Sequence, residues 1–322
     1  MTADTPTVAR SLTCGHIGPM RPRALTALLW LPIAMPIAAQ ENVLIAFNAG
    51  SLARPLRAAL DSFAAREKVT IQQENAGSLE TARKLTDLGR VPDVIGLADH
   101  EVFEQLLMPR YVSEYYEFAR NRMVLAYTPK SEFASEITGA TWIDILLRTG
   151  VETGRADPAL DPNGYRTLLV WQLAETFYQR PGLARRLLEA TPPRNVRPNE
   201  AALVGVLQAG EFDYIWSYES IAQAAGLQYV HLPPEVDLGD PAMAARYAAV
   251  SVRVPGNTPK DTITFRGAPI LYGVAVPDAA PHKALARRFL DWLLSADGVR
   301  VLRGAKLDAL DHALLVRSPS TE

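Results

Sequence analysis

Apolar runs of strand length alternate with amphipathic stretches of helical spacing along most of the chain. Residues 43–47 are continuously apolar, and residues 52–66 then carry apolar positions at the spacing of a helix. The same succession recurs over residues 69–73 and 79–88, and a third apolar run covers residues 93–98. Continuously apolar strands that alternate with helices are typical of a parallel sheet with both faces covered. The pattern therefore predicts an α/β fold.

The alternation continues toward the C-terminus. Further strands are predicted over residues 123–127, 213–218, 229–232, 248–254 and 270–276, and further helices over residues 141–147, 165–178, 199–208, 219–225 and 283–294. Residues 311–322 show no such pattern and are predicted to form a loose tail. A chain of 322 residues is long enough for two hydrophobic cores, so two α/β lobes are favoured over one.

The N-terminal segment has a different pattern. Arg21 and Arg23 precede the apolar run 24–31, and small residues follow at Ala38–Ala39. A basic start, a short apolar stretch and a small-residue end are the marks of a secretory signal, and the stretch is too short and too interrupted by proline for a membrane span. We therefore predict that residues 1–39 are an upstream segment and a cleaved signal peptide, and that the mature protein is periplasmic. A single membrane anchor is the alternative.

Composition and charge narrow the possible functions. The formal net charge of −2 provides neither a basic face for nucleic acid nor a polybasic membrane anchor. Cys14 is the only cysteine and lies in the N-terminal segment, and the five histidines are scattered. The mature sequence therefore offers no disulfide, no thiol nucleophile and no metal-ligand spacing. Because the sequence also lacks a nucleophile elbow, a phosphate loop and a dinucleotide loop, we expect neither an enzyme nor a bound cofactor.

Three turns of small residues precede predicted helices. They are Gly50–Ser51, Gly77–Ser78 and Asp161–Pro162–Asn163–Gly164. The first turn of a helix exposes unpaired N–H groups and a partial positive charge, and ligands of α/β folds bind at the carboxyl ends of strands. Together the turns predict a site for a small oxyanion that uses no lysine or arginine. Each turn taken alone could equally be an ordinary helix cap.

Two acids and a tyrosine accompany these turns. Asp161 opens the third turn, Glu200 lies in the first turn of helix 199–208, and Tyr218 ends strand 213–218. Each has a structural explanation by itself: a turn or cap acid, an acid that complements the helix dipole, and a core tyrosine. The two acids are nevertheless unexpected in an anion site, because like charges repel.

Six short motifs, taken in order, are similar to those of one known family. They are FNAGSL at 47–52, ENAGS at 74–78, MPRY at 108–111, FARNRMVLAYT at 118–128, DPNGYR at 161–166 and RPNE at 197–200. On these motifs the chain resembles, over residues 43–305, the tungstate-binding branch of the periplasmic molybdate/tungstate-binding proteins of ABC importers. The resemblance implies a two-lobed periplasmic-binding fold of type II, with a mostly parallel sheet flanked by helices in each lobe and hinge strands between the lobes. Lobe 1 is predicted at residues 41–127 plus 269–316, and lobe 2 at residues 128–268.

The resemblance also implies a ligand site. The implied oxyanion ligands are Gly50, Ser51, Ser78, Asp161, Pro162, Asn163, Glu200 and Tyr218. The glycine and serines would offer N–H and hydroxyl donors, residues 162–163 would offer backbone donors, and the tyrosine would offer its hydroxyl. Asp161 and Glu200 would bind the metal centre, with Glu219 as the second choice for the latter acid. Where the family often has a histidine this chain has Asn48, which leaves the role of that side chain open.

The two acids make chemical sense for one kind of anion. A carboxylate beside sulfate or phosphate is repelled unless it is protonated, whereas molybdenum and tungsten accept additional oxygen ligands, so that a carboxylate can bond to the metal. The resemblance therefore implies a monomeric receptor that captures molybdate or tungstate and delivers it to the membrane subunits of an ABC permease. A phosphate- or sulfate-type receptor is one alternative, and a transferase on the same two-lobed fold is another.

Overall fold

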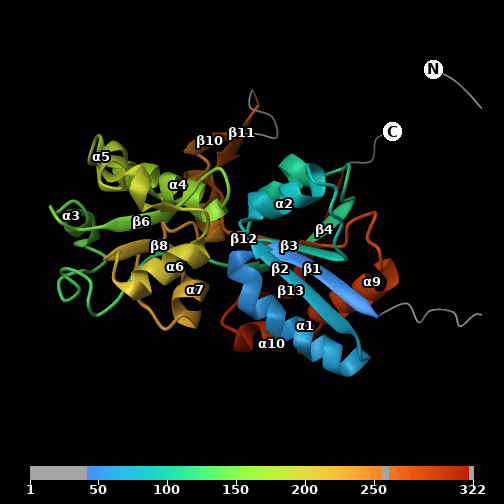
Figure 1. The fold of residues 1–322 in the computed structure, drawn as a ribbon. Coiled ribbons are helices and arrows are strands. Elements are labelled where there is room, and N and C mark those ends of the chain that lie inside the picture. The colour runs from blue at the N-terminus through green and yellow to red at the C-terminus, as the bar shows by residue number, and fades with distance from the viewer. Residues whose placement is uncertain (1–41, 256–260, 319–322) are drawn as a thin grey trace, which may run out of the picture. The chain divides into compact units, whose positions relative to one another are not determined.

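The computed structural model describes residues 42–255 and 261–318, so the predicted signal segment lies outside the described residues. These residues form a six-stranded sheet, a five-stranded sheet and a two-stranded hairpin (Figure 1). We call the six-stranded sheet with its helices the first lobe and the five-stranded sheet with its helices the second lobe. The two α/β lobes predicted from the sequence are therefore present.

The first lobe is built on a sheet with the strand order β13–β4–β12–β3–β1–β2. Its strands are β1 (Val43–Ala49), β2 (Thr70–Ala76), β3 (Val94–Leu97), β4 (Glu114–Arg120), β12 (Leu271–Ala275) and β13 (Asp308–Arg317). Strand β1 is parallel to β2 and β3, as predicted, but β12 and β13 run antiparallel to their neighbours. The sheet is mixed rather than mostly parallel, because these two strands return to it after the chain has passed through the second lobe. The prediction of a loose tail from residue 311 is wrong as far as Arg317, which ends β13.

The second lobe has the strand order β7–β6–β8–β5–β9. Its strands are β5 (Met123–Tyr127), β6 (Thr153–Ala156), β7 (Val196–Arg197), β8 (Tyr214–Tyr218) and β9 (Gln228–His231), and the hairpin consists of β10 (Ser251–Pro255) and β11 (Thr262–Arg266). Strand β6 is parallel to β7 and β8, whereas β5 is antiparallel to β8 and β9. This sheet is mixed as well, because the strand by which the chain enters it runs against the others.

Helices cover both faces of each sheet. They are α1 (Ala53–Glu67), α2 (Ser78–Thr86), α3 (Trp142–Leu146), α4 (Pro162–Phe177), α5 (Leu183–Glu189), α6 (Glu200–Ala209), α7 (Glu219–Ala224), α8 (Ala244–Tyr247), α9 (Lys283–Leu293) and α10 (Ala296–Gly304). In the first lobe α2 lies on one face of the sheet, and α1, α9 and α10 lie on the other (Figure 1). In the second lobe Trp216 of β8 contacts Trp171 of α4. Ile215, which precedes Trp216 in the strand, packs in a cluster with Leu203 of α6. Because neighbouring strand residues face opposite sides, α4 and α6 cover opposite faces of that sheet.

The chain crosses between the two sheets at two neighbouring points. Strand β4 ends at Arg120 in the first sheet and β5 begins at Met123 in the second, so the first crossing is at residues 121–122. The predicted boundary after Tyr127 is therefore misplaced by one strand, because β5 pairs with β8 and β9. The return crossing lies between β11 and β12, close to the predicted position. The Asn121 N–H donates to the carbonyl of Ile270 at 3.2 Å, which holds the two crossings together.

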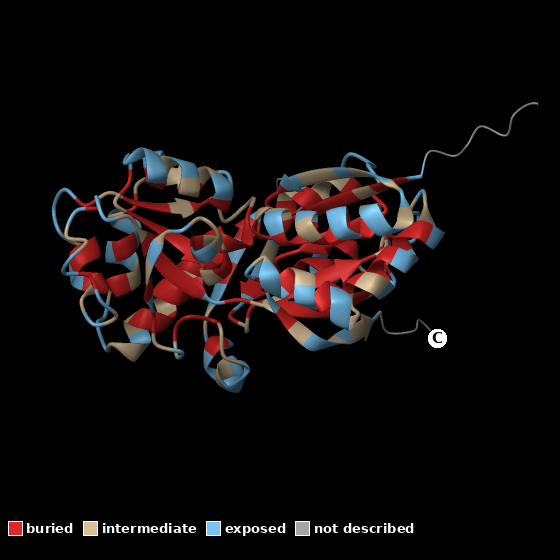
Figure 2. Cartoon of the chain, turned by 90° about the horizontal axis from the view of Figure 1, so that it is seen from below, coloured by how far each residue is buried: buried red, intermediate tan, exposed pale blue. Residues whose placement is uncertain are grey.

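Burial follows the amphipathic pattern that the sequence showed. Buried residues concentrate in the strands and on the inner faces of the helices, while the outer helix faces are exposed (Figure 2). Helix α9 buries Leu285, Phe289 and Leu293 at successive turns, which gives it one apolar stripe against the sheet. Within the described ranges, every helix is too short or too polar to cross a bilayer.

Candidate functional site

The first predicted turn lies where β1 gives way to a 3₁₀ turn over Gly50–Leu52 and then to α1. Ser51 is buried, and its Oγ has no hydrogen-bond partner within the described parts of the chain. Burial raises the pKa of Tyr272, and the neighbouring Ser51 hydroxyl partly offsets that rise. The Ser51 hydroxyl therefore lies beside that phenol with its own hydrogen-bonding capacity left over.

The second turn packs directly against the third. Gly77 precedes α2, and a Cβ added to it would lie 2.2 Å from the carbonyl oxygen of Leu160 and 3.1 Å from the Cα of Asp161. Only glycine permits this approach of two backbones. The neighbouring Ser78 is fully buried, and its Oγ accepts a hydrogen bond from the Ala98 N–H at 2.9 Å. The structure thus brings Ser78 and Asp161 together, from opposite lobes.

Asp161 is the N-cap of α4. Its Oδ1 accepts the N–H of Asn163 at 2.9 Å, and its Oδ2 accepts the N–H of Glu200 at 3.3 Å. One carboxyl group therefore joins the starts of α4 and α6. This geometry changes the predicted backbone role of residues 162–163. Pro162 has no N–H and cannot donate, and the Asn163 N–H is already bound to Asp161.

Glu200 lies in the first turn of α6 and faces the end of β8. Its Oε1 accepts the Ser217 hydroxyl at 2.6 Å and the Tyr218 N–H at 2.7 Å. Its Oε2 is buried without a hydrogen-bond partner among residues 42–255 and 261–318, and so is Oδ1 of Asn163, whose amide Nδ2 donates to the Trp216 carbonyl. Buried polar oxygens are normally paired, so an unpaired oxygen such as Oε2 of Glu200 points to a missing partner.

The two carboxyl groups hold protons more tightly than exposed acids do. Burial raises the pKa of Asp161 to about 6, although the N–H groups of Asn163 and Glu200 oppose the rise. Burial raises the pKa of Glu200 to about 8, and the negative charge of Asp161 adds to that rise, while the Ser217 hydroxyl opposes it. Both acids therefore favour the protonated form more than exposed carboxyl groups do, and Glu200 does so more strongly than Asp161.

Tyr218 is buried at the end of β8 and contacts Arg166, which was not among the predicted site residues. Arg166 of α4 donates from Nη1 to the Tyr218 hydroxyl at 2.8 Å and to the Ala98 carbonyl at 2.6 Å, and its Nη2 lies 2.9 Å from Oδ2 of Asp99. An arginine therefore lies beside Tyr218, one of the predicted oxyanion ligands, and Asp99 compensates its charge. Arg166 lies within the DPNGYR motif, and that position was the available signal.

Asn121 and Tyr272 were also not among the site residues predicted from the sequence. At the first crossing between the sheets, the Nδ2 of Asn121 donates to the Tyr272 hydroxyl at 2.8 Å and to Oγ of Ser220 at 2.7 Å. The rings of Tyr272 and Tyr218 meet edge to face at 6.1 Å. Both tyrosines therefore belong to one buried layer, but no local motif marks Tyr272, which sits in an apolar strand far along the chain.

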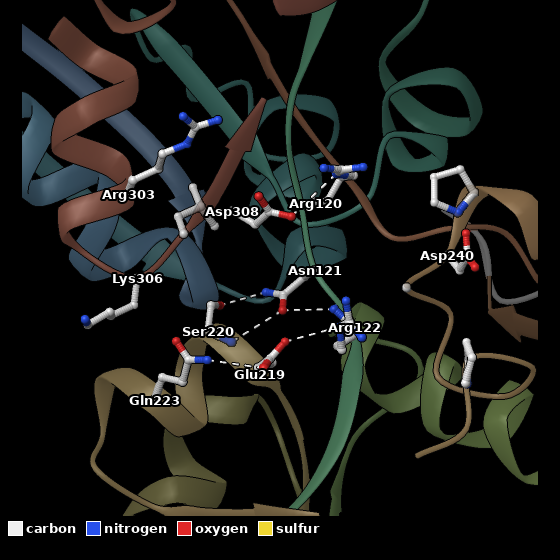
Figure 3. Close-up of a pocket in the computed structure, with 14 residues that line it drawn as sticks. Arg120, Asn121, Arg122, Glu219, Ser220, Gln223, Asp240, Arg303, Lys306 and Asp308 are labelled. Atoms are coloured by element: carbon white, nitrogen blue, oxygen red, sulfur yellow. Dashed lines mark hydrogen bonds and ion pairs between the residues drawn. The ribbon is translucent and has the colours of Figure 1, made fainter. Parts of the chain in front are cut away.

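Glu219, the second choice for the acid, lies elsewhere. Its carboxylate pairs with Nε of Arg122 at 3.2 Å and accepts from the Gln223 amide at 3.2 Å (Figure 3). These groups line a pocket of about 510 Å³ together with Arg120, Arg303 and Asp308. Because Glu219 faces this pocket and Glu200 faces Asp161, the structure favours Glu200 as the partner of Asp161.

The described residues contain no group of three or more His, Cys, Asp or Glu side chains placed to hold a metal ion. They therefore do not support a site in which side chains alone bind a metal. Asp161 and Glu200 form a pair, and a pair can complete the coordination of a metal that brings its own oxygen ligands. The turn that contains Ser51 packs against α6, which begins at Glu200, and the Tyr218 N–H donates to Glu200, so both hydroxyl-bearing residues lie near that pair.

Comparison with known proteins identifies the family. The family model for bacterial extracellular solute-binding proteins matches residues 44–305. An uncharacterized solute-binding protein of Petrotoga mobilis is 41% identical over 260 residues, covering 80% of this chain and 81% of the relative. The molybdate/tungstate-binding protein WtpA of Pyrococcus abyssi is 37% identical over 295 residues, covering 83% of this chain and 84% of the relative.

Solved structures agree on the fold. The periplasmic molybdate-binding protein of Azotobacter vinelandii superposes with a TM-score of 0.60 at 15% identity, covering 82% of this chain and 98% of that one. The sulfate-binding protein SubI of Mycobacterium tuberculosis gives 0.57 at 14% identity, covering 84% and 88%. The family and these relatives are solute-binding proteins and not enzymes, which removes the transferase alternative. The chain belongs to the family of bacterial extracellular solute-binding proteins.

Proposed function

We propose that this protein is a periplasmic receptor that binds molybdate or tungstate and delivers it to an ABC permease. One observation carries the proposal: the buried carboxyl group of Asp161 accepts the backbone N–H of Glu200 at the starts of two helices, and Oε2 of the buried Glu200 carboxyl group has no partner among the described residues. The name of the Pyrococcus relative supports the same ligands. The secretion signal predicted over residues 1–39 supports the location.

The proposed chemistry uses both kinds of group at the site. The hydroxyls of Ser51 and Tyr218 would donate to oxo groups of the anion, while Glu200 and Asp161 would each offer an oxygen to the metal. A carboxylate that faces sulfate or phosphate gains nothing comparable, because those anions have no open coordination positions and their charge repels it. The same two acids that a sulfate receptor avoids would therefore give this receptor its selectivity.

The transport step follows from the lobes. Ser78 belongs to the first lobe and Asp161 to the second, so an anion between them would be enclosed when the lobes close. Closure of the lobes around a ligand usually distinguishes the loaded form of such a receptor from its empty form. We propose that the closed monomer is the form that the permease subunits accept.

Isothermal titration calorimetry with tungstate, molybdate, sulfate and phosphate tests the ligand class. We expect tight binding of tungstate and molybdate and weak or no binding of the other two. The variants Asp161→Ala and Glu200→Ala should each weaken tungstate binding by at least tenfold, which corresponds to about 1.4 kcal/mol.

The variant Glu219→Gln is the matched control, because it removes a neighbouring acid that faces the other pocket. It should bind tungstate as the wild type does. Unchanged tungstate binding in both alanine variants would exclude coordination by these acids. Tight phosphate or sulfate binding with no response to tungstate would replace the proposed ligand with the runner-up class.

A further inference from the structure

Arg166 is a buried cation that touches both lobes at the candidate site. It lies on α4 of the second lobe and is 3% exposed. Its Nη1 donates to the carbonyl of Ala98, and its Nη2 pairs with Asp99, both of which follow β3 of the first lobe. The same Nη1 donates to the hydroxyl of Tyr218, at the end of β8 in the second lobe. One side chain thus links two lobes and a proposed ligand residue.

The direction of the bond to Tyr218 is fixed by chemistry. A guanidinium group has only donors, so the phenol oxygen of Tyr218 must be the acceptor. The hydrogen of that phenol then has to find another acceptor. In the described part of the chain, the contact with Arg166 is the single hydrogen bond of the Tyr218 hydroxyl. Because the residue is 1% exposed, bulk water is not the acceptor either.

The two acids lie beside Tyr218. Its N–H donates to Oε1 of Glu200 at 2.7 Å, and the Glu200 N–H donates to Oδ2 of Asp161 at 3.3 Å. Asp99 compensates the charge of Arg166 and also accepts the hydroxyl of Tyr165. Because Arg166 contacts the phenol oxygen of Tyr218, its effect on a ligand would pass through the orientation of that phenol.

We infer that Arg166 is a positioning residue that makes Tyr218 a donor toward the bound oxyanion and that does so only while Ala98 and Asp99 of the first lobe hold the guanidinium in place. This inference rests on the proposed function, because it needs an anion in front of Tyr218. It adds a residue outside the predicted ligand set, and it links ligand recognition to the contact between the lobes.

A double-mutant cycle tests the inference, with tungstate as the probe in calorimetry. The single variants are Tyr218→Phe, which removes the hydroxyl, and Arg166→Met, which keeps an unbranched side chain as far as the position of Nε but removes the guanidinium donors. A hydrogen bond to a charged group predicts that Tyr218→Phe weakens binding roughly 10- to 100-fold. If Arg166 acts through Tyr218, the double variant binds about as weakly as the weaker single variant, because the second substitution removes an interaction that is already lost.

The matched control is Arg83→Met. Arg83 also ties the lobes, since it donates from α2 to the carbonyls of Ala159 and Pro255, but it makes no contact with Tyr218. In the double variant, the fold-losses of tungstate affinity caused by Arg83→Met and by Tyr218→Phe should multiply. A third variant, Arg166→Lys, keeps a donor-only cation and should bind more tightly than Arg166→Met, which a general loss of packing would not produce. Circular dichroism and thermal melting of each variant report whether it folds.

The affinities of these variants decide whether Arg166 acts through Tyr218. Multiplicative losses for Arg166→Met and Tyr218→Phe, or an unchanged affinity in Arg166→Met, would overturn the inference while leaving the proposed function intact. Failure of the wild type to bind any oxyanion would overturn the proposed function and the inference with it. If Arg166→Met does not fold, Arg166→Lys in the cycle with Tyr218→Phe gives the same test, and multiplicative losses there again refute the positioning role.

Discussion

At the scale of single residues, the buried carboxyl of Glu200 contributes to the pH dependence of stability. Its pKa is raised to about 8 in the folded ligand-free protein, mainly by burial. The folded state therefore binds a proton that the unfolded chain has released. The contribution of Glu200 to stability is intact below its ordinary pKa of 4.5 and is lost as the pH rises to about 8, by on the order of a few kcal/mol.

The isosteric variant Glu200→Gln isolates this contribution. Its amide keeps an acceptor oxygen for Ser217 and Tyr218 but does not ionise. In urea unfolding without ligand, we expect the free energy of unfolding of the wild type to fall between about pH 5 and about pH 9 more steeply than that of the variant. Equal slopes for the two proteins would show that Glu200 is not buried as a neutral acid.

The sign of the pH dependence of binding separates the two ligand classes. Coordination of a metal centre requires the carboxylate form, so tungstate binding should release up to one proton from Glu200 near pH 7 and should strengthen as the pH rises toward about 8. A sulfate-type ligand would instead prefer the protonated acid, and its binding would weaken over the same range. Calorimetry in buffers of different ionisation enthalpy measures the proton release directly, and Glu200→Gln should release none.

At the scale of elements, the start of α2 depends on one glycine. A Cβ at position 77 would meet the Leu160 carbonyl at 2.2 Å, and that carbonyl belongs to the backbone of the other lobe. We expect Gly77→Ala to leave each lobe folded, because its φ of −62° suits alanine, but to separate α2 from the loop before α4. Tungstate binding should then weaken at least tenfold, in line with the usual cost of overpacking.

A second glycine provides the control for that variant. Gly205 lies within α6, and a Cβ there would meet nothing within 4 Å. Gly205→Ala should leave tungstate affinity unchanged and raise thermal stability slightly, since alanine favours helix by about 1 kcal/mol. Calorimetry and thermal melting of the two variants make the comparison. Equal binding by both variants would show that the contact between the two backbones is not needed for binding.

The elements also show how far the sequence could lead. Local signals predicted a helix soon after Asp161 and another at Glu200, because caps and first-turn acids depend on neighbours in the chain; α4 begins at Pro162, earlier than the predicted residue 165, and α6 begins at Glu200, one residue after the predicted start. The direction of β12 and β13 depends on where the chain returns from the second lobe, which no local pattern encodes. The same reason hides the pair of Arg166 and Asp99: each residue has a common type and an unremarkable neighbourhood, and only the fold brings them together.

At the scale of the whole molecule, the two crossings of the chain are adjacent and form one connection between the lobes. Asn121 joins them by donating its N–H to Ile270, and its side chain joins Ser220 of the second lobe to Tyr272 of the first. The proposed ligand groups lie at the ends of strands and the starts of helices of both lobes. A ligand that contacts them all should therefore stabilise both lobes together.

Hydrogen exchange measured by mass spectrometry with and without tungstate tests this expectation. Tungstate at about a thousand times its Kd should add about 4 kcal/mol to the apparent stability. Slower exchange should appear at residues 49–52 and 77–81 of the first lobe and at residues 161–167 and 217–220 of the second, because these segments hold the proposed ligands. Sulfate at the same concentration is the control and should change none of them. Protection confined to one lobe would mean that the anion binds to an open surface, and enclosure between the lobes would then be the wrong mechanism of capture.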